Sequence, residues 1–292
     1  MKAFKKIATV VISAGIIVAI FWQIDIAKFA AVFAEIKWPW FIAGLLCFMP
    51  VYMVLVSRLR YLAGRALRPG DALRLILAAS SLNTVLPSKG GDLVKGMFIK
   101  RYTGRSVSEG LSIVVLERVS DLTALVVIMI AGLILLGNYA AEGLFAWAIG
   151  MALLGGAIFY FFMHLYNFNE GGIIRHLRRI PKIGGLYDAS RTLVRRQVFE
   201  GGIARVFAYS LASWLTQLFQ FFCFFYALGF EGPAMAIVGL VPAAIVIGLL
   251  PITVAGFGTR DLAMIVLFAP WAPAETMAGI AILSHLRYIL PG

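Results

Sequence analysis

Residues 122–136, LTALVVIMIAGLILL, would be apolar on every side of a helix, and this limits the fold more than any other feature of the sequence. A helix on a soluble core keeps one polar face, whereas a helix that is apolar all round is buried or spans a membrane. Residues 143–163 have the same character, and 61% of the chain is hydrophobic. Because about 20 apolar residues cross a bilayer, the sequence predicts an all-α integral membrane protein.

Positive charges indicate which side of the membrane each loop occupies, because cytoplasmic loops collect Lys and Arg. With a cytoplasmic N-terminus and a short cytoplasmic loop over 58–68, only Lys28, Lys37 and Arg260 of the 26 basic residues lie outside the cytoplasmic half. The net charge of +12 therefore reports membrane orientation, and no nucleic-acid partner is expected. We expect a bacterial inner-membrane protein whose basic linker, about 167–205, lies on anionic headgroups. A cleaved signal peptide is the less favoured alternative.

Two Leu-Pro breaks interrupt the apolar pattern, in SLNTVLPSKGGDLVKG at 81–96 and in LLPITVAGFGTRDL at 249–262. Pro removes a backbone donor and Gly permits unusual dihedrals, so each break frees backbone groups that protein, water or ligand must satisfy. We predict one membrane domain, a polytopic helical bundle. It has about six full spans plus two re-entrant broken hairpins, at about 72–110 and 234–269.

In this layout the two hairpins enter from opposite sides of the membrane, as in transporters built from inverted-topology repeats. The similarity between them is slight, because Pro87 precedes Asp92 by five residues whereas Pro251 precedes Asp261 by ten. Whether the two halves arose by internal duplication therefore stays open.

Residues at these two breaks and the charges of the span that follows the first break are the candidates for a binding site. A charge near the bilayer centre costs roughly 2.5–3.5 kcal/mol on insertion scales, so such residues face a wet cavity or a partner. N–H groups at the start of a half-helix attract anions, and Arg is a bidentate phosphate donor. The candidate substrate-binding residues are Asn83, Pro87, Lys89, Gly90, Gly91, Asp92, Lys95, Glu117, Arg118, Asp121, Pro251, Gly256, Gly258, Arg260 and Asp261.

Each group also has a purely structural interpretation. The charges at 117–121 would neutralise one another on one helix near the headgroups, and those at 89–95 would form a cytoplasmic surface face. Asn83 would satisfy backbone groups at the break. On a later span, the polar stripe over 214–220 fits hydrogen bonds between helices about as well as substrate contact.

Several motifs are similar to those of one known family: NTVLPSKGGDLVK at 83–95, VVLERVSDL at 114–122, PITVAGFGTRD at 251–261 and HLRYILPG at 285–292. The sequence resembles the lysylphosphatidylglycerol synthase transmembrane, or flippase-like, family over nearly its whole length. The resemblance implies a region that moves aminoacylated phospholipid across the bilayer. In two-domain members a cytosolic aminoacyltransferase domain follows it. We do not expect that synthase activity here, since the sequence ends at Gly292.

No enzymatic activity is expected from the sequence. Its three histidines are scattered without metal-ligand spacing, and it has no Walker loop, so neither metal nor cofactor is predicted. The leading hypothesis is translocation of an anionic phospholipid or lipid-linked phosphate, uncoupled or ion-coupled, with Glu117, Asp121 and Asp261 as proton carriers in the second case. The alternatives are a non-transporting lipid-binding subunit that supports a partner lipid synthase or glycosyltransferase, and, ranked last, an intramembrane lipid-modifying enzyme.

Overall fold

A computed structural model of the chain describes residues 2–64, 67–85, 90–137, 150, 181–199, 202–249, 253 and 256–289. Within these ranges the regular secondary structure is entirely helical. The first helices are α1 (Lys2–Gln23), α2 (Ile26–Ala34), α3 (Trp38–Leu46), α4 (Phe48–Ala63), α5 (Pro69–Val85) and α6 (Gly90–Thr103). They are followed by α7 (Val107–Leu136), α10 (Pro181–Phe199), α11 (Gly202–Ala227), α12 (Ala234–Gly248), α13 (Thr259–Phe268) and α14 (Ala274–Ile289).

Two stretches are long and apolar enough to cross a bilayer: Trp38–Ala63, which joins α3 and α4, and Val107–Leu136. A third is added if Val11–Gln23 and α2, which are bent by 86° at a short break, count as one span. The described residues therefore form the all-helical bundle of a membrane protein. The total of six full spans stays a prediction, and the span expected at 143–166 lies outside the described residues.

Each of the two Leu-Pro breaks lies between two helices. α5 packs along α6, and α12 packs along α13. Of the residues at the breaks themselves, Pro87, Lys89 and Pro251 lie outside the described residues. The entry of the two hairpins from opposite sides of a membrane stays a prediction.

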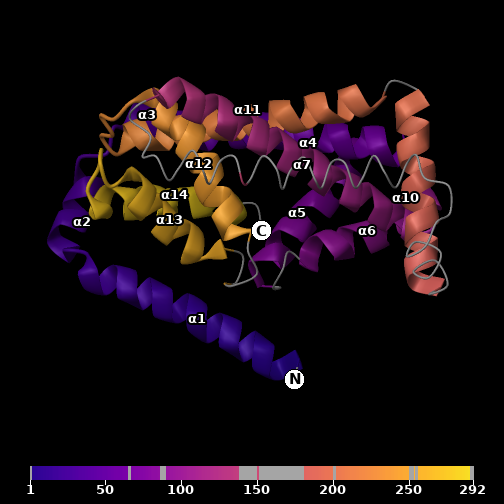
Figure 1. Cartoon of the computed structure of the whole chain (residues 1–292), viewed down its shortest axis with the longest axis horizontal. Helices are drawn as coiled ribbons and strands as arrows, with labels where there is room; N and C mark the ends of the chain where they lie inside the picture. Colours follow the sequence, from indigo (N-terminus) through magenta and orange to yellow (C-terminus); the bar gives the residue numbers. More distant parts are fainter. Residues whose placement is uncertain are drawn as a thin grey trace.

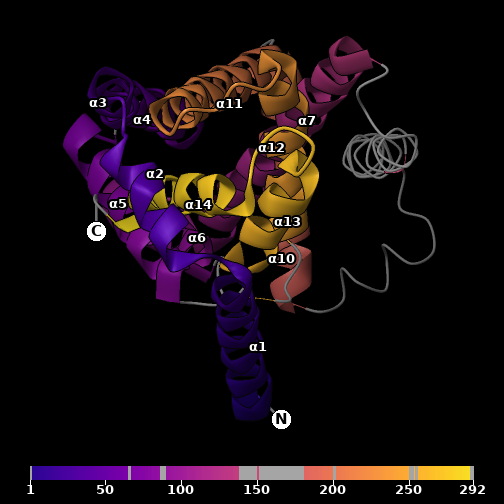
Figure 2. The same ribbon diagram turned by 90° about the vertical axis from the view of Figure 1, so that its left-hand side faces the viewer.

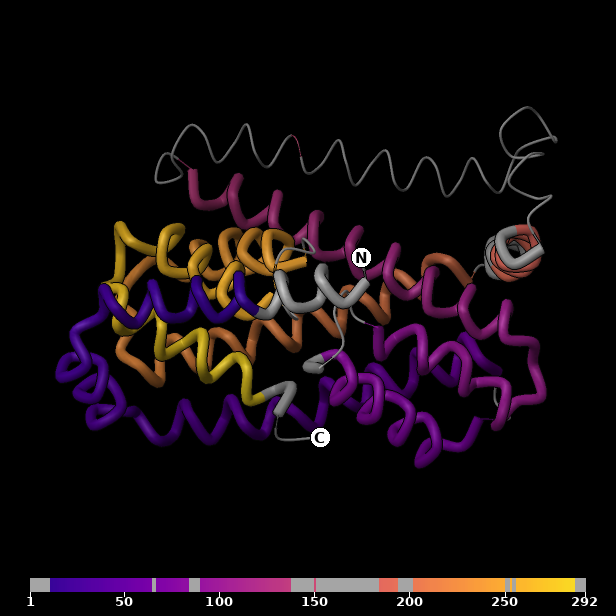
Figure 3. The backbone as a smooth tube through the Cα atoms, turned by 90° about the horizontal axis from the view of Figure 1, so that it is seen from below, coloured from indigo at the N-terminus to yellow at the C-terminus, as the bar shows by residue number. Residues whose placement is uncertain are grey.

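The long helices α7 and α11 run along the length of the molecule, with α12 packed on α7 (Figure 1). α10, which belongs to the basic linker, lies across this direction and is seen end-on in Figure 3. Such an orientation is typical of helices that lie at a membrane surface. α1 projects from the body (Figure 2), and its Ile16 side chain lies beside Gly258 at the start of α13.

Two apolar cores share α7 and α11. The first core joins the beginning of α7 to α4, α5 and α6, and the second joins the end of α7 to α11, α12, α13 and α14. Between Leu116 of the first core and Leu125 of the second, α7 carries buried Glu117 and Asp121. We call the buried polar residues at this level the polar layer: Arg58, Glu117, Asp121, Ser210, Ser213 and Gln217.

The contact between α7 and α12 depends on the absence of a side chain at Gly132. A Cβ there would lie 2.6 Å from the carbonyl carbon of Val238 and 2.7 Å from the Cα of Gly239. We predict that Gly132→Ala pushes the helices apart and lowers the free energy of unfolding by about 1–3 kcal/mol, the usual cost of overpacking. Thermal unfolding of the purified protein in detergent measures this loss.

The matched control is Gly15→Ala on α1, because nothing lies within 4 Å of a Cβ built at Gly15. Ala has the higher helix propensity, so this variant should be as stable as the wild type or slightly more stable. Equal melting temperatures for the two variants would show that the α7–α12 contact is not close-packed.

Candidate functional site

Six charged side chains of alternating sign connect α4, α6 and α7. Each is within 4.0 Å of the next. We call them the six-charge chain, which runs in the order Asp92, Arg118, Asp121, Arg58, Glu117, Lys95.

Arg58 is the central cation of the six-charge chain and is 1% exposed. Its Nη1 and Nη2 donate to the two carboxylate oxygens of Asp121, the second at 3.2 Å, and its Nε lies 3.4 Å from Glu117 Oε1. Nη1 also donates to Ser210 Oγ at 2.9 Å. A guanidinium holds its donors in a rigid fork that matches a carboxylate, so this one residue ties α4 to both α7 and α11.

Lys95 and Arg118 extend the six-charge chain to α6. Lys95 Nζ lies 2.6 Å from Glu117 Oε2, whereas Arg118 Nε lies 3.4 Å from Asp92 Oδ2 and its Nη2 3.9 Å from Asp121 Oδ2. Lys95 and Asp92 are buried, but 37% of the Arg118 side chain is exposed. Of the three cations in the six-charge chain, Arg118 is therefore the one that a ligand reaches most easily.

The charges of α7 lie well inside the helix and not at its entrance. Glu117 is ten residues from Val107, where α7 begins, which corresponds to about 15 Å along the axis. An unpaired ion at such a buried position costs several kcal/mol. Three cations facing three carboxylates remove that cost, since the six-charge chain is formally neutral.

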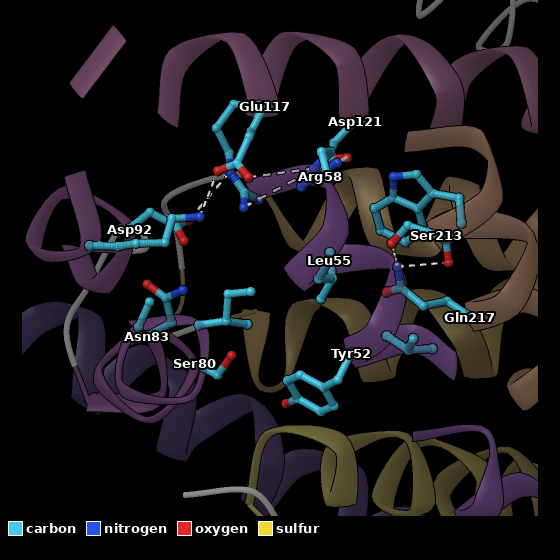
Figure 4. A pocket seen from close by; sticks show the side chains of 16 residues that line it. Tyr52, Leu55, Arg58, Ser80, Asn83, Asp92, Glu117, Asp121, Ser213 and Gln217 are labelled. Carbon is cyan, nitrogen blue, oxygen red and sulfur yellow. Dashed lines mark hydrogen bonds and ion pairs between the residues drawn. The ribbon is translucent and has the colours of Figure 1, made fainter. Parts of the chain in front are cut away.

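A cavity of about 140 Å³ lies beside the six-charge chain and is lined by all six of its members (Figure 4). Tyr52, Ser80, Asn83, Trp214 and Gln217 also line it, together with apolar side chains. Asn83 Oδ1 and Trp214 Nε1 are buried and have no hydrogen-bond partner among the residues that the structure describes. A buried polar group left unpaired costs about 1–3 kcal/mol, so the wall offers an occupant one acceptor and one donor.

The close approach of α6 to α5 brings Asp92 and Lys95 to this cavity. A Cβ built on buried Gly91 would lie 2.9 Å from both the backbone nitrogen and Oδ1 of Asn83, and it would overlap the carbonyl of Ala79. Only glycine fits there. At this first break Gly91 therefore acts by its size, and Gly90 begins the helix as a partly exposed residue.

Arg260 and Asp261 of the second hairpin are not among the described residues that line the cavity. Arg260 is 5% exposed, and its Nη2 donates to Ser284 Oγ at 2.9 Å and to His285 Nδ1 at 2.7 Å, both on α14. Asp261 accepts a hydrogen bond from the Gly258 backbone N–H at 2.9 Å. We call these residues on α13 and α14 the His285 cluster: Arg260, Asp261, Ser284 and His285.

The structure thus brings Asn83, Asp92 and Lys95 of the first hairpin together with the charges of α7, and it places Arg260 and Asp261 in a separate cluster. Gly256 and Gly258 have φ values of +80° and +93°, which L side chains rarely adopt. They shape the turn that precedes α13, while their predicted role in substrate binding stays a prediction.

The sequence predicts Arg58 in a cytoplasmic loop, and the structure corrects this. Clustered Arg after an apolar run is typical of such a loop, but α4 continues to Ala63. A helical pattern was present: Arg58 follows Leu55 by three residues and precedes Leu62 by four, which puts it on their face. Arg60, on another face, donates from Nε to the Leu67 carbonyl at 2.9 Å.

The polar stripe of α11 divides between two roles. Trp214 and Gln217 line the cavity, and Gln217 Nε2 donates to Ser213 Oγ at 2.9 Å. Gln220 Nε2 instead donates to the Gly44 carbonyl at 2.8 Å, which is a hydrogen bond between α11 and α3.

Residues 6–292 match the family model of the lysylphosphatidylglycerol synthase transmembrane region. No curated protein matches the sequence significantly. Within the described part of the chain, no group of three or more His, Cys, Asp or Glu residues is arranged to hold a metal ion.

We predict that Arg58→Met lowers the free energy of unfolding by about 3–5 kcal/mol, because it leaves Asp121 and Glu117 buried without their shared partner. Chemical unfolding in detergent measures this loss. Adding Asp121→Asn to this variant should restore part of the lost stability, because it removes one of the two carboxylates that Arg58 no longer neutralises.

The matched control is Lys28→Met, which removes an exposed ion pair with Asp25. It should lower the free energy of unfolding by only about 0–1 kcal/mol. If Arg58→Met is no more harmful than Lys28→Met, the six-charge chain does not hold the helices together.

Proposed function

Because the chain belongs to the family of lysylphosphatidylglycerol synthase transmembrane regions, we propose that it moves a phosphate-bearing lipid between the two leaflets of a membrane. One observation carries the proposal: a polar cavity lined by six charges lies inside an otherwise apolar helical bundle. Intramembrane charges of this kind mark substrate pathways.

The two faces of α4 and α11 suit a lipid. On their inner faces Tyr52 and Trp214 line the cavity. The outer faces of the same two helices expose large apolar side chains. A headgroup would occupy the cavity while the acyl chains stay in the bilayer against this outer surface, at Met49, Met53, Leu215 and Phe219.

Arg118 is the residue proposed to bind the lipid phosphate. Because the six-charge chain is neutral, an anionic headgroup must take a cation from a carboxylate that already pairs with it. Arg118 is the best placed, since its nearest carboxylate oxygen is 3.4 Å away and its side chain is partly exposed. Lys95, only 2.6 Å from Glu117, would keep its partner.

Asn83 and Trp214 are proposed to bind the rest of the headgroup. The unpaired Asn83 oxygen accepts a hydrogen bond and the unpaired Trp214 N–H donates one. A headgroup hydroxyl can satisfy both, whereas a headgroup amine, which is an ammonium at neutral pH, can donate to Asn83 only. Movement of the hairpins about their Leu-Pro breaks would then open the cavity to either leaflet.

The proposal is tested with protein reconstituted in vesicles that carry a labelled anionic phospholipid in one leaflet. The wild type should speed the loss of label from that leaflet. Arg118→Gln should slow it at least about tenfold, because a hydrogen bond to a charged group contributes about 1.5–3 kcal/mol. The control is Arg74→Gln, which changes a 79% exposed side chain outside the cavity and should move lipid as the wild type does.

Three outcomes separate the hypotheses. If Arg118→Gln is folded and moves lipid at the wild-type rate, the cavity is not the route. If the wild type binds lipid but moves none, with or without an ion gradient, the alternative of a lipid-binding subunit for a partner enzyme takes first place. A lipid that lacks phosphate should move no faster than in vesicles without protein.

A further inference from the structure

His285 is a buried titratable residue that the proposed lipid site does not use. It is 8% exposed and lies on α14 between Arg260 and Asp261 of α13. Among the side chains of proteins, only histidine ordinarily gains or loses a proton between about pH 5 and 8. Arg260, a donor, lies within hydrogen-bond distance of both ring nitrogens, and Asp261, an acceptor, lies beside Nε2.

The partners of the ring determine where its proton sits. Arg260 Nη2 lies within hydrogen-bond distance of both ring nitrogens, 2.7 Å from Nδ1 and 3.3 Å from Nε2, and because arginine can only donate it bonds the nitrogen that carries no proton. The carboxylate of Asp261 can only accept, so Nε2, at 2.9 Å from Oδ1 and 3.1 Å from Oδ2, must donate. The ring that satisfies both contacts is therefore the neutral tautomer with its proton on Nε2.

A second proton can enter only at Nδ1, and it breaks the bond to Arg260. The lone pair of Nδ1 that accepts from Arg260 would form the new N–H bond, and two donors would then face each other. The imidazolium would also place a second cation beside the guanidinium, with Asp261 as their shared carboxylate. The two positive charges repel each other strongly at this distance.

We infer that His285 is a proton-binding site that controls how α13 is attached to α14. In the neutral form Arg260 is bonded to the ring. In the protonated form the ring keeps Asp261, and Arg260 leaves it. Loss of the proton restores the bond. The inference goes beyond the proposed movement of lipid and does not depend on it.

On the described part of the chain, Arg260 and Asp261 are charged side chains in contact with the ring. Phe257 stacks on the ring at 4.2 Å between centroids. α12, which packs on α13, has no charged residue. Other charged groups described on the helices that pack against α13 or α14 have partners elsewhere: Lys28 and Glu275 at Asp25, Asp71 with Arg74, and Arg205 over Tyr61.

The first turn of α13 is where a proton would act. Arg260 and Asp261 are the second and third residues of α13, directly after the turn formed by Gly256 and Gly258. The Arg260 contact to His285 joins the beginning of α13, at the second break, to α14, beside the Arg260–Ser284 and Asp261–His285 contacts. Its loss would loosen this turn.

Hydrogen–deuterium exchange of the full chain in vesicles tests this directly. After correction for the intrinsic pH dependence of exchange, amides of 256–268 should exchange at least about tenfold faster at about pH 5 than at about pH 8. The factor corresponds to losing one hydrogen bond to a charged group. His285→Asn should show no such change, because its amide can accept from Arg260 and donate to Asp261 but takes no proton.

Phe257→Leu is the matched control, since it removes the stacked ring and leaves the titratable group in place. It should keep the pH response. A response of His285→Asn equal to that of the wild type would overturn the inference, as would a wild type whose exchange over 256–268 does not change with pH.

A second measurement needs no variant of the cluster. In wild-type protein with ¹⁵N-labelled histidine, the His285 nitrogens should show a protonated Nε2 and a bare Nδ1 at about pH 8, with Nδ1 gaining a proton on acidification. The His285 signals are identified by comparison with the spectra of His164→Asn and His176→Asn, each of which lacks the signals of one of the other two histidines. A proton found on Nδ1 at about pH 8 would overturn the inference, and this test remains available even if His285→Asn does not fold.

Discussion

The ion pairs of Arg58 with Asp121 and Glu117 are the interaction on which the arrangement of the bundle depends. They lie between two apolar cores and connect α4 to the middle of α7. Lys95 and Arg118 extend the pairs to α6, so the first hairpin is also held at this level. Because charges of both signs alternate, a formally neutral set of ions can stay buried where a single one would be expelled.

The two hairpins differ in the helices that they contact, and we assign them different roles for that reason. The first hairpin meets α7 and α4, and the cavity beside the six-charge chain is open to a ligand at Arg118. The second hairpin meets α14, and Arg260 is enclosed by Ser284 and His285. A lipid headgroup suits the first site, which has an unpaired donor, an unpaired acceptor and an exposed cation. A proton suits the second, in which the titratable ring of His285 lies between Arg260 and Asp261.

Local sequence patterns found the buried charges but not how they combine. Glu117 and Asp121 could be predicted because they interrupt an apolar run, where a charge is costly, and Asp92 because it follows the first Leu-Pro break and its glycines. Arg58 was missed because its Arg neighbours suggested a loop, although its spacing from leucines indicated a buried helical face. The pairing of Arg260 with His285 could not be predicted, since 25 residues separate them and only the packing of α13 on α14 brings them together.

Photo-crosslinking with a phospholipid that carries its reactive group on the headgroup tests the central claim most directly. If the cavity binds the headgroup, crosslinked peptides should map to the lining residues of α4, α5 and α11, around Tyr52, Ser80 and Trp214. An excess of unlabelled lipid should compete with this labelling. Crosslinks confined to outward-facing residues such as Met53 and Phe219 would contradict the claim, because they would show lipid around the bundle and none inside it.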